Sequence, residues 1–495
     1  MLMANMYVDY KWYDRFMKVR LILGVILVLG FIWRIYNFEK GFSFAHDQDL
    51  YSWIAKDILI NHHQRLIGQV TSVEGVFIGS AYYYLMAIFY WIFNLNPLSA
   101  VIPTVVGGLI TIGSIYWIFS RHFGKYIGAI GAFIYSVSFG VAAYDRWSVP
   151  TQPTMLWSVW YLLVILEAIR GNQKIIYLYA VLLGLLWQIH IALLPVVIIP
   201  MIAFGLRKFE IKKMLIAGII LMLTASPFFI FEIRHNFSQS RAILNGSQKE
   251  MGGPTGKMKV IKVLNASGKE IQTRLFFGWD KFSKSEYWWF GYLAVFTFIF
   301  YKKREWRRHL FILSLWPISM LVIQFWSKRV VSEYYFSNIL PVVILILSIA
   351  LSEIRRKYII LGLGLGYFLL NLGWLVNKSE LDHSYYYRNK LVKAIKADVI
   401  KNKYSCVAVN FIADPGFSWG FRYLWWYNGV GVVKASTPNI PIYNVFVPAP
   451  LGDKDKAQYF GRFGLVRPEN KIYSINPDDC KKDEYQLEPM LGYVE

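Results

Sequence analysis

The stretch Phe44-Ala45-His46-Asp47-Gln48-Asp49-Leu50-Tyr51 directly follows the first long apolar segment of the chain, residues 21–38. It places two carboxylates in a short polar loop at the end of a predicted membrane helix. Ionisable groups at such a position have to be hydrated, paired or used in chemistry. Because many further apolar segments follow, we interpret this loop as the functional part of a membrane protein and Asp47 as a candidate catalytic base.

The composition is typical of an integral membrane protein. Of the 495 residues, 56% are hydrophobic and 17% are charged, and the mean hydropathy is +0.37. The net charge of +22 comes from Lys and Arg clusters between apolar runs, where cations orient helices in a bilayer. We therefore exclude nucleic acid and expect membrane lipids as partners. The sequence has no Walker-type loop, dinucleotide fingerprint or Cys/His metal motif, which disfavours ATP-driven and dinucleotide chemistry.

Crossing a bilayer takes about 20 apolar residues, and the sequence offers eleven candidate runs. They occupy residues 21–38, 77–95, 98–119, 126–143, 153–169, 175–206, 214–231, 287–301, 310–326, 334–351 and 358–376. The run 175–206 is long enough for a tight helix pair. The run 77–95 is rich in Tyr and Trp and suits a helix lying in the membrane interface. We predict about eleven crossings, and the alternative that 77–95 crosses while another run does not stays open.

Six cation clusters decide the predicted orientation. They are Lys11/Arg15/Lys18/Arg20, Arg121/Lys125, Arg170/Lys174, Arg207/Lys208/Lys212/Lys213, Lys302/Lys303/Arg304/Arg307/Arg308 and Arg355/Arg356/Lys357. Membrane proteins concentrate such clusters on the cytoplasmic side, so we expect a multi-pass protein of the cell membrane with its N-terminus inside. Residues 39–97, 144–152, 232–286 and everything after about 377 then face outward. The loop 232–286 is also basic, but long translocated loops follow this rule poorly.

The composition changes after Asn377. Residues 385–403 and 419–427 have the pattern of helices, and 404–412 and 440–447 that of strands. We predict a transmembrane domain at 1–376 and a small extracytoplasmic α/β domain at 377–495. Both cysteines of the chain, Cys406 and Cys480, lie in the second domain. The sequence leaves open whether they form a disulfide or stay free thiols.

A single outward-facing carboxylate at a membrane can support glycosyl transfer. Hydrolysis of a glycosidic bond usually takes two carboxyl groups, but a sugar carried on a lipid phosphate already has a good anionic leaving group. One base for the acceptor hydroxyl, together with cations for the phosphate, then suffices. Asp47 suits the first role. Arg146, in the second outward loop, suits the second because a guanidinium presents paired N–H donors to phosphate oxygens.

Other candidates each have a structural alternative. Asp49 either binds a divalent cation together with Asp47 or caps a helix that begins near Leu50, so no cofactor is certain. Glu74 ends the same loop and either orients the acceptor or is a solvated charge. His190 lies where the run 175–206 turns at the outer surface, and it either meets the substrate or packs between helices.

A later outward loop carries further candidates. Lys328 and Arg329 open this loop and either complete a cationic phosphate site or anchor the helix by snorkelling. Tyr335 follows in the segment Glu333-Tyr334-Tyr335-Phe336. We include Arg329 and Tyr335 among the candidate substrate-binding residues.

The order and shared side of these motifs resemble the GT-C glycosyltransferases of the family 39 type, the bacterial relatives of protein O-mannosyltransferases and lipid A aminoarabinose transferases. In that family an Asp-Glu pair is followed by a tyrosine four residues after the Asp. Asp47 and Tyr51 keep this spacing, and Gln48 replaces the Glu. The resemblance covers roughly residues 20–376. It extends to Ile78–Tyr84 without the family's proline, to Tyr144-Asp145-Arg146-Trp147, and to the segment from Tyr334 to Pro341.

The resemblance implies a GT-C fold and a polyprenyl-phosphate sugar as donor, with undecaprenyl or dolichyl as the lipid. It further implies an inverting transfer to a protein, lipid or glycan acceptor, no direct use of a nucleotide sugar, and Asp47 as the base. Because Gln48 replaces the second acid, Asp49 is its candidate substitute. Asp145 is the candidate carboxylate of the second loop, since Gln152 cannot ionise.

Two other classes of function compete with this interpretation. A flippase or transporter of lipid-linked oligosaccharides tends to place ionisable residues or broken helices near the bilayer midplane. Here the informative carboxylates lie in an outer loop. A polysaccharide polymerase of the cell envelope is expected to use a large Arg-rich outer loop, which residues 232–286 resemble. We favour the transferase.

Overall fold

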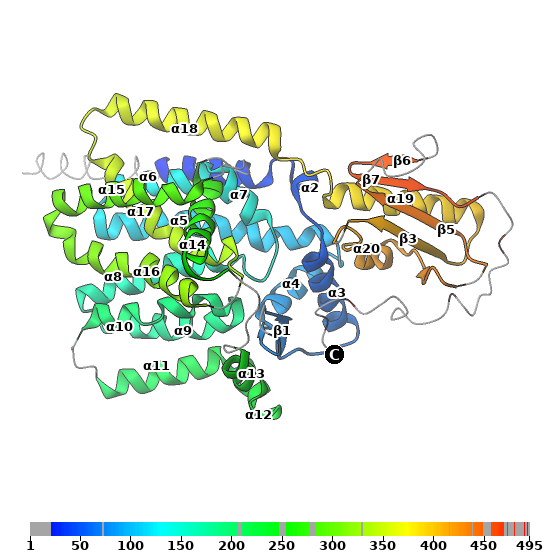
Figure 1. Cartoon of the computed structure of the whole chain (residues 1–495), viewed down its shortest axis with the longest axis horizontal. Helices are drawn as coiled ribbons and strands as arrows, with labels where there is room; N and C mark the ends of the chain where they lie inside the picture. The colour runs from blue at the N-terminus through cyan, green and yellow to red at the C-terminus, as the bar shows by residue number, and fades with distance from the viewer. Residues whose placement is uncertain are drawn as a thin grey trace, which may run out of the picture.

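The computed structural model describes residues 21–71, 74–205, 210–246, 254–276, 284–327, 330–414, 416–437, 439–448 and 457–469, and the single residues 473, 480, 490 and 493. Long helices lie side by side and form a bundle, and a domain with a β-sheet lies beyond one end of it (Figure 1). Residues 38–92, predicted to face outward and named the first outer segment, begin with α2 (Phe38–Gly41) and α3 (His46–Ile60) and lie between these two parts (Figure 1).

Every apolar run found in the sequence contains helix. The helices of the bundle are Leu21–Ile35 and, with their labels, α5 (Val101–Phe123), α6 (Lys125–Val137), α7 (Phe139–Arg146), α8 (Thr154–Arg170), α9 (Ile175–Ile189), α10 (Ile199–Phe204), α11 (Ile211–Thr224), α12 (Ser226–Arg234), α15 (Trp288–Lys302), α16 (Arg307–Trp326), α17 (Leu340–Ser352) and α18 (Lys357–Lys378). Short 3-10 helices precede α5, α10, α15, α16 and α17, at η1 (Pro97–Ala100), η2 (Ile191–Val196), η3 (Ser285–Tyr287), η4 (Arg304–Trp306) and η5 (Glu333–Ile339).

Four helical stretches in the described part of the chain are long and apolar enough to cross a membrane: Pro97–Phe123, Arg304–Trp326, Glu333–Ser352 and Lys357–Lys378. Two more crossings arise if each bent helix pair is one span, namely α6 with α7, bent by 63°, and α11 with α12, bent by 67°. Leu21–Ile35, Ile175–Ile189 and Ile191–Phe204 are shorter apolar helices. Eleven crossings therefore stay a prediction.

The burial of the helices shows which of them are central and which are peripheral. Helix α8 is buried along nearly its whole length, as expected for a helix that is apolar on all sides and surrounded by others. Helix α18 is only 11% buried over its apolar window, and α11 has a single buried residue, Ala217. The outward faces of α11 and α18 are therefore the surfaces that suit contact with lipid.

The first outer segment continues with β1 (Ile67–Val70), β2 (Phe77–Gly79) and α4 (Ala81–Ile92). Helix α4 has 12 residues, fewer than the roughly 20 that a span takes. One of its faces, with Tyr83 and Tyr90, is buried, whereas Ile88 and Trp91 are exposed. This length and two-sided character favour the interfacial position predicted from the sequence.

The predicted outward loop 232–286 contains α13 (Ser238–Gly246) and α14 (Gly256–Leu275). Helix α14 lies across the bundle, seen nearly end-on in Figure 1, and packs against α7, α16 and η5. Val263, Ile271 and Leu275 on α14 are fully buried. A large part of this region thus belongs to the helical core and is not an exposed loop.

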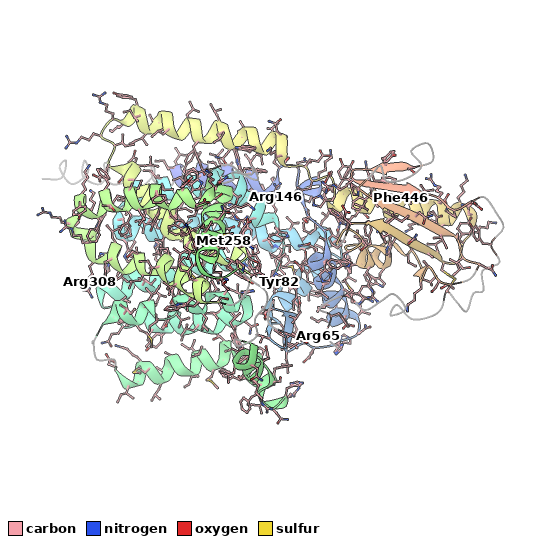
Figure 2. The ribbon with its side chains drawn as sticks, viewed as in Figure 1. Arg65, Tyr82, Arg146, Met258, Arg308 and Phe446 are labelled. Carbon is pink, nitrogen blue, oxygen red and sulfur yellow. A yellow bond between two sulfur atoms is a disulfide. The ribbon has the colours of Figure 1, made fainter. Side chains whose placement is uncertain are left out.

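Most of the cation clusters come together at the end of the bundle that is remote from the sheet domain. Arg121 and Arg170 both contact Glu167, and Lys302 and Lys303 both contact Glu353. Lys213 donates a hydrogen bond to Gln173, beside Arg170 and Lys174. Figure 2 shows Arg308 at this end and Arg146 toward the other. The cluster at residues 11–20 lies outside the described residues.

The C-terminal domain contains α19 (Tyr385–Asn402), β3 (Val407–Ala413), α20 (Arg422–Asn428), β4 (Val432–Val433), β5 (Ile442–Val447), β6 (Gln458–Phe460) and β7 (Phe463–Val466). The sheet order is β4-β3-β5-β7-β6, with β3 parallel to β4 and β5, and β7 antiparallel to β5 and β6. Each helix and strand predicted for this domain is present, with bounds that differ by a few residues. Cys406 and Cys480 form a disulfide, which resolves the alternative left open by the sequence.

The C-terminal domain shares one hydrophobic core with the first outer segment. Phe44, Leu50 and Tyr51 pack in the same cluster as Val407 and Tyr443. Because burying apolar side chains is the main source of cohesion between packed elements, this shared core holds the two regions together. The position of the sheet domain is therefore fixed relative to the loop that carries Asp47.

Candidate active site

A cavity of about 940 Å³ lies where the helical bundle, the first outer segment and the C-terminal domain meet. Its lining includes His46, Asp47 and Gln48 from the first segment, Arg146 and Trp147 around the end of α7, Glu270 and Arg274 from α14, Tyr334 from η5, and His383 and Trp419 from the C-terminal domain. Asp47 and Arg146, about a hundred positions apart in the sequence, thus line one cavity. This is the juxtaposition that the sequence interpretation depends on.

Asp47 lies in the first turn of α3, where the helix dipole favours a negative charge. Its Oδ1 accepts a hydrogen bond from Gln69 Nε2 at 2.9 Å, and the residue is half-buried. Asp47 also lines a second cavity of about 160 Å³, together with His190 and Thr151. Trp147 and Tyr334 line both cavities as well. The carboxylate therefore stands between two spaces that can hold different molecules.

Gln48 connects the first outer segment to the residues that follow α7. Its Nε2 donates to the Ser148 carbonyl oxygen at 2.7 Å, and its Oε1 accepts the Ala45 N–H at 2.9 Å. A neutral amide supplies both a donor and an acceptor here, whereas an ionised Glu only accepts. This geometry gives a physical reason for glutamine at the position where the resembling family has Glu.

Asp49 faces away from the cavity and caps a helix of the C-terminal domain. Its Oδ2 accepts the Arg422 N–H at 3.0 Å and its Oδ1 accepts the Tyr423 N–H at 2.7 Å, at the start of α20. Burial raises the pKa of this carboxyl although these two hydrogen bonds lower it. The sequence interpretation considered a cap for a helix near Leu50, but the helix that Asp49 caps begins 373 residues further along the chain.

The hypothesis of a cation shared by Asp47 and Asp49 does not fit this arrangement. Both oxygens of Asp49 accept backbone N–H groups, so Asp49 is not available as a second ligand beside Asp47. Within the described part of the chain, no group of three or more His, Cys, Asp or Glu residues is placed to hold a metal ion. We therefore derive no step through a metal.

Arg146 is the last residue of α7 and only 2% exposed. Its Nη1 donates to the Tyr36 carbonyl oxygen at 2.9 Å, while its Nε has no partner. Among the described residues no carboxylate forms an ion pair with it. A buried cation without a counter-ion is costly. The guanidinium is therefore suited to receive an anion in the cavity.

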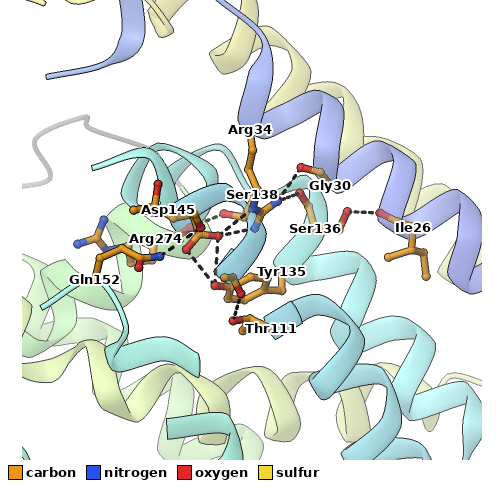
Figure 3. Close-up of polar contacts among 12 residues, drawn as sticks. Ile26, Gly30, Arg34, Thr111, Tyr135, Ser136, Ser138, Asp145, Gln152 and Arg274 are labelled. Carbon is orange, nitrogen blue, oxygen red and sulfur yellow. Dashed lines mark hydrogen bonds and ion pairs between the residues drawn. The ribbon is translucent and has the colours of Figure 1, made fainter. Parts of the chain in front are cut away.

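Asp145, the neighbour of Arg146, is fully engaged elsewhere (Figure 3). Its Oδ2 accepts from Arg34 Nε at 2.9 Å and from Arg34 Nη2 at 2.7 Å, and the Tyr135 hydroxyl donates to both carboxylate oxygens. Asp145 does not line either cavity. Asp145 thus forms an ion pair with Arg34 of the first helix. It therefore does not neutralise its sequence neighbour Arg146.

The bend between α6 and α7 directs Arg146 toward the cavity. The Phe139 N–H at the start of α7 donates to Asn371 Oδ1 of α18 at 2.8 Å, and the Ser138 hydroxyl donates to the Arg274 carbonyl oxygen. A helix can turn sharply where backbone groups find partners outside the helix. These two contacts fix α7 between α14 and α18.

Glu270 and Arg274 on α14 line the cavity and were missed in the sequence analysis. Arg274 Nε donates to Glu270 Oε1 at 2.8 Å, and the Ser337 hydroxyl donates to the same oxygen at 2.6 Å. The Arg274 guanidinium lies 3.9 Å from the centre of the Tyr144 ring. Their spacing of four residues was a detectable signal for a helical ion pair. The region was overlooked because it was interpreted as an exposed loop.

His190 borders the smaller cavity together with Asp47. Its Nδ1 accepts the Ala192 N–H at 2.9 Å, so a neutral imidazole carries its proton on Nε2. The ring packs against Tyr334 and Tyr335, with centroids 5.9 and 5.5 Å away. Tyr335 lines a space of about 10 Å³ and neither of the two cavities that Asp47 lines. Its neighbour Tyr334, which was not among the predicted site residues, lines both main cavities.

Three residues singled out in the sequence have no place in the described site. Glu74 is exposed in the turn before β2 and lines neither cavity. Lys328 and Arg329 lie outside the described residues, so their predicted role stays a prediction.

The bundle and the bent α7 thus bring Arg146, which has no carboxylate partner among the described residues, into the lining of the same cavity as Asp47. Residues 80–231 match the family model described as dolichyl-phosphate-mannose-protein mannosyltransferase. No curated protein sequence matches the chain. Together with the structural similarities given below, the match to this family model supports the resemblance of the chain to the GT-C glycosyltransferases.

Solved structures share the fold at low sequence identity. ArnT from Cupriavidus metallidurans bound to undecaprenyl phosphate has a TM-score of 0.56 at 12% identity, over 92% of this chain and 99% of that one. Its apo form has a TM-score of 0.55 at 11% identity, over 92% and 98%. The apo oligosaccharyltransferase of Archaeoglobus fulgidus has a TM-score of 0.50 at 12% identity, over 83% and 63%.

Proposed function

We propose that this chain transfers a sugar from a polyprenyl-phosphate donor to an acceptor hydroxyl at the outer face of the membrane, with Asp47 as the general base. The observation that carries the proposal is the placement of Asp47 and the unpaired Arg146 in the lining of one cavity. A similar fold has been solved with undecaprenyl phosphate, in ArnT. A carboxylate and a buried cation are the two groups that this reaction needs from the protein.

The proposed step balances with these groups alone. The acceptor oxygen attacks the anomeric carbon, and its bond to that carbon forms as the bond from carbon to the phosphate oxygen breaks. The acceptor proton passes to the Asp47 carboxylate. The lipid phosphate leaves with the electron pair, and Arg146 stabilises the charge that develops on it. Attack from the side opposite the phosphate inverts the anomeric centre.

The position of Asp47 between two cavities supports this arrangement. The larger cavity, with Arg146, suits the phosphate and sugar of the donor, and the smaller one suits the acceptor hydroxyl. A base has to lie within hydrogen-bond reach of the proton it removes. A carboxylate that borders both spaces meets the acceptor where it approaches the donor sugar.

The outward location of the site rests on two observations. Most of the described cation clusters lie at the opposite end of the bundle, the end that the inside-positive rule assigns to the cytoplasm. The C-terminal domain beside the site holds the Cys406–Cys480 disulfide, and disulfides persist mainly in oxidising compartments outside the cytoplasm.

The proposal is tested with purified protein in lipid nanodiscs. Undecaprenyl-phosphate monosaccharides carrying a labelled sugar are the donors, and an envelope fraction is the acceptor. Asp47→Asn keeps the shape of the side chain but removes the base, so we expect transfer to fall by about 10²-fold or more. Glu305→Gln, an exposed carboxylate outside both cavities, is the matched control. Wild-type transfer by the Asp47→Asn variant overturns the base assignment.

A further inference from the structure

The C-terminal domain contributes an aromatic wall to the large cavity. Trp419 lines this cavity and is 45% exposed. Its ring lies 4.7 Å, centroid to centroid, from the ring of His46, the residue before Asp47. A large indole exposed inside a cavity leaves apolar surface in contact with water, and a ligand with an apolar face can cover that surface.

The backbone around Trp419 is held tightly against the loop that carries Asp47. Gly420, at φ +90°, approaches so closely that a Cβ there would lie 2.5 Å from the Phe44 carbonyl oxygen and 3.1 Å from the Ala45 Cα. Both the positive φ and this contact require glycine. Two residues further on, the cap from Asp49 fixes the start of α20. The backbone therefore holds Trp419 at a fixed position in the wall of the cavity.

The other residues that line the cavity indicate which kind of ligand would contact Trp419. Arg146 provides the cation for a phosphate in the same space, and in the donor the sugar is bonded directly to that phosphate. A sugar ring presents apolar C–H groups on its faces, which pack favourably on an aromatic ring. Resting on the function proposed above, we propose that Trp419, backed by His46, is the platform on which the sugar ring of the donor stacks. The C-terminal domain thereby takes part in selecting the sugar.

The test measures how tightly the full chain in nanodiscs binds two kinds of lipid. One is bare undecaprenyl phosphate, and the other is undecaprenyl phosphate that carries a hexose or a pentose. The wild-type protein is expected to bind one of the sugar-bearing lipids more tightly than the bare one. Trp419→Ala is expected to weaken that lipid about tenfold and to leave bare undecaprenyl phosphate unchanged. Trp419→Phe, which keeps an aromatic face, is expected to retain most of the preference. Binding of the bare lipid also shows that the variants are folded.

Tyr459→Ala is the matched control, because Tyr459 in β6 is 46% exposed and does not line the cavity. The platform alone is overturned if wild-type protein binds the bare lipid but Trp419→Ala holds the sugar-bearing lipids as tightly as Tyr459→Ala does. It is also overturned if the wild type shows no preference for any sugar-bearing lipid. Failure of the wild type to bind either kind of lipid instead overturns the proposed function and the platform with it.

Discussion

Asp49 Oδ1 accepts the backbone N–H of Tyr423 at 2.7 Å, across a separation of 374 residues. Asp47, only two positions earlier, lines the cavity. Residues two apart on an α-helix point to nearly opposite sides because each residue turns the helix by about 100°. The two carboxylates of this short motif therefore have different surroundings: Asp47 faces the cavity, and Asp49 joins the C-terminal domain to the first outer segment.

Replacing Asp49 by alanine is expected to loosen this joint. The change removes a buried carboxylate that accepts two hydrogen bonds from backbone N–H groups at the start of α20, which together are worth about 3 to 6 kcal/mol. We expect a lower melting temperature in detergent and faster amide hydrogen exchange in α20. Asp47→Ala, which loses one hydrogen bond to Gln69, is the control and is expected to leave α20 protected. Unchanged exchange in α20 of the Asp49 variant contradicts the capping role.

Arg146→Ala is expected to weaken donor binding. A hydrogen bond to a charged group contributes about 1.5 to 3 kcal/mol, so loss of the guanidinium predicts roughly 10- to 100-fold weaker binding of undecaprenyl phosphate. Arg121→Ala, at the opposite end of the bundle, removes an equal charge and is expected to bind as wild type does. Binding is measured in nanodiscs at low salt. Equal affinity of the two variants means that Arg146 serves only the fold.

Local patterns in the sequence predicted the elements of the fold well. Apolar runs gave helices, and alternating segments such as 440–447 gave strands, because periodicity depends only on nearby residues. The cation clusters predicted that Asp47 and Arg146 share one side of the membrane, and the structure has both residues in the lining of one cavity. Each of these inferences needed no knowledge of long-range packing.

The remaining features depend on contacts between distant parts of the chain. Nothing near Asp49 indicates that its partner is the N–H of Tyr423, and nothing near Asp145 indicates Arg34. Helix α14 has a polar, basic sequence typical of an exposed segment, yet most of its C-terminal half is buried, and there Glu270 and Arg274 neutralise each other. Tertiary packing decided these positions, and local composition pointed the other way.

The buried ion pair of Arg34 with Asp145 leads to a prediction about coupling. Removing one partner leaves an uncompensated buried charge, which typically costs about 3 to 5 kcal/mol, whereas replacing both partners by apolar residues costs far less. Arg34→Met and Asp145→Leu are each expected to lower the melting temperature strongly, and the double variant is expected to recover much of the loss. Thermal unfolding of the four proteins in one detergent measures this cycle. Additive losses contradict a direct pairing.

Asp57, in the last turn of α3 and outside the lining of both cavities, predicts a pH dependence of stability. It accepts hydrogen bonds from Asn61 Nδ2 at 2.7 Å, from Arg65 Nη2 at 2.9 Å and from the Tyr493 hydroxyl at 3.1 Å. Burial by itself raises the pKa of Asp57, but these hydrogen bonds outweigh it and hold the pKa below its ordinary value. The His63 ring, 3.1 Å from the same carboxylate, is a further group that faces it.

Because the folded state lowers this pKa, the carboxylate contributes stability above the pKa of about 4 that it has in the unfolded chain. That contribution disappears as the pH falls through the lower pKa of the folded state. The Asp57→Asn variant lacks this contribution to stability at every pH. The gap in melting temperature between wild type and Asp57→Asn is therefore expected to be constant above about pH 5 and to narrow below about pH 4. Thermal unfolding across this range, with the His63→Ala background as control, measures the gap, and a gap that widens on acidification contradicts the assignment.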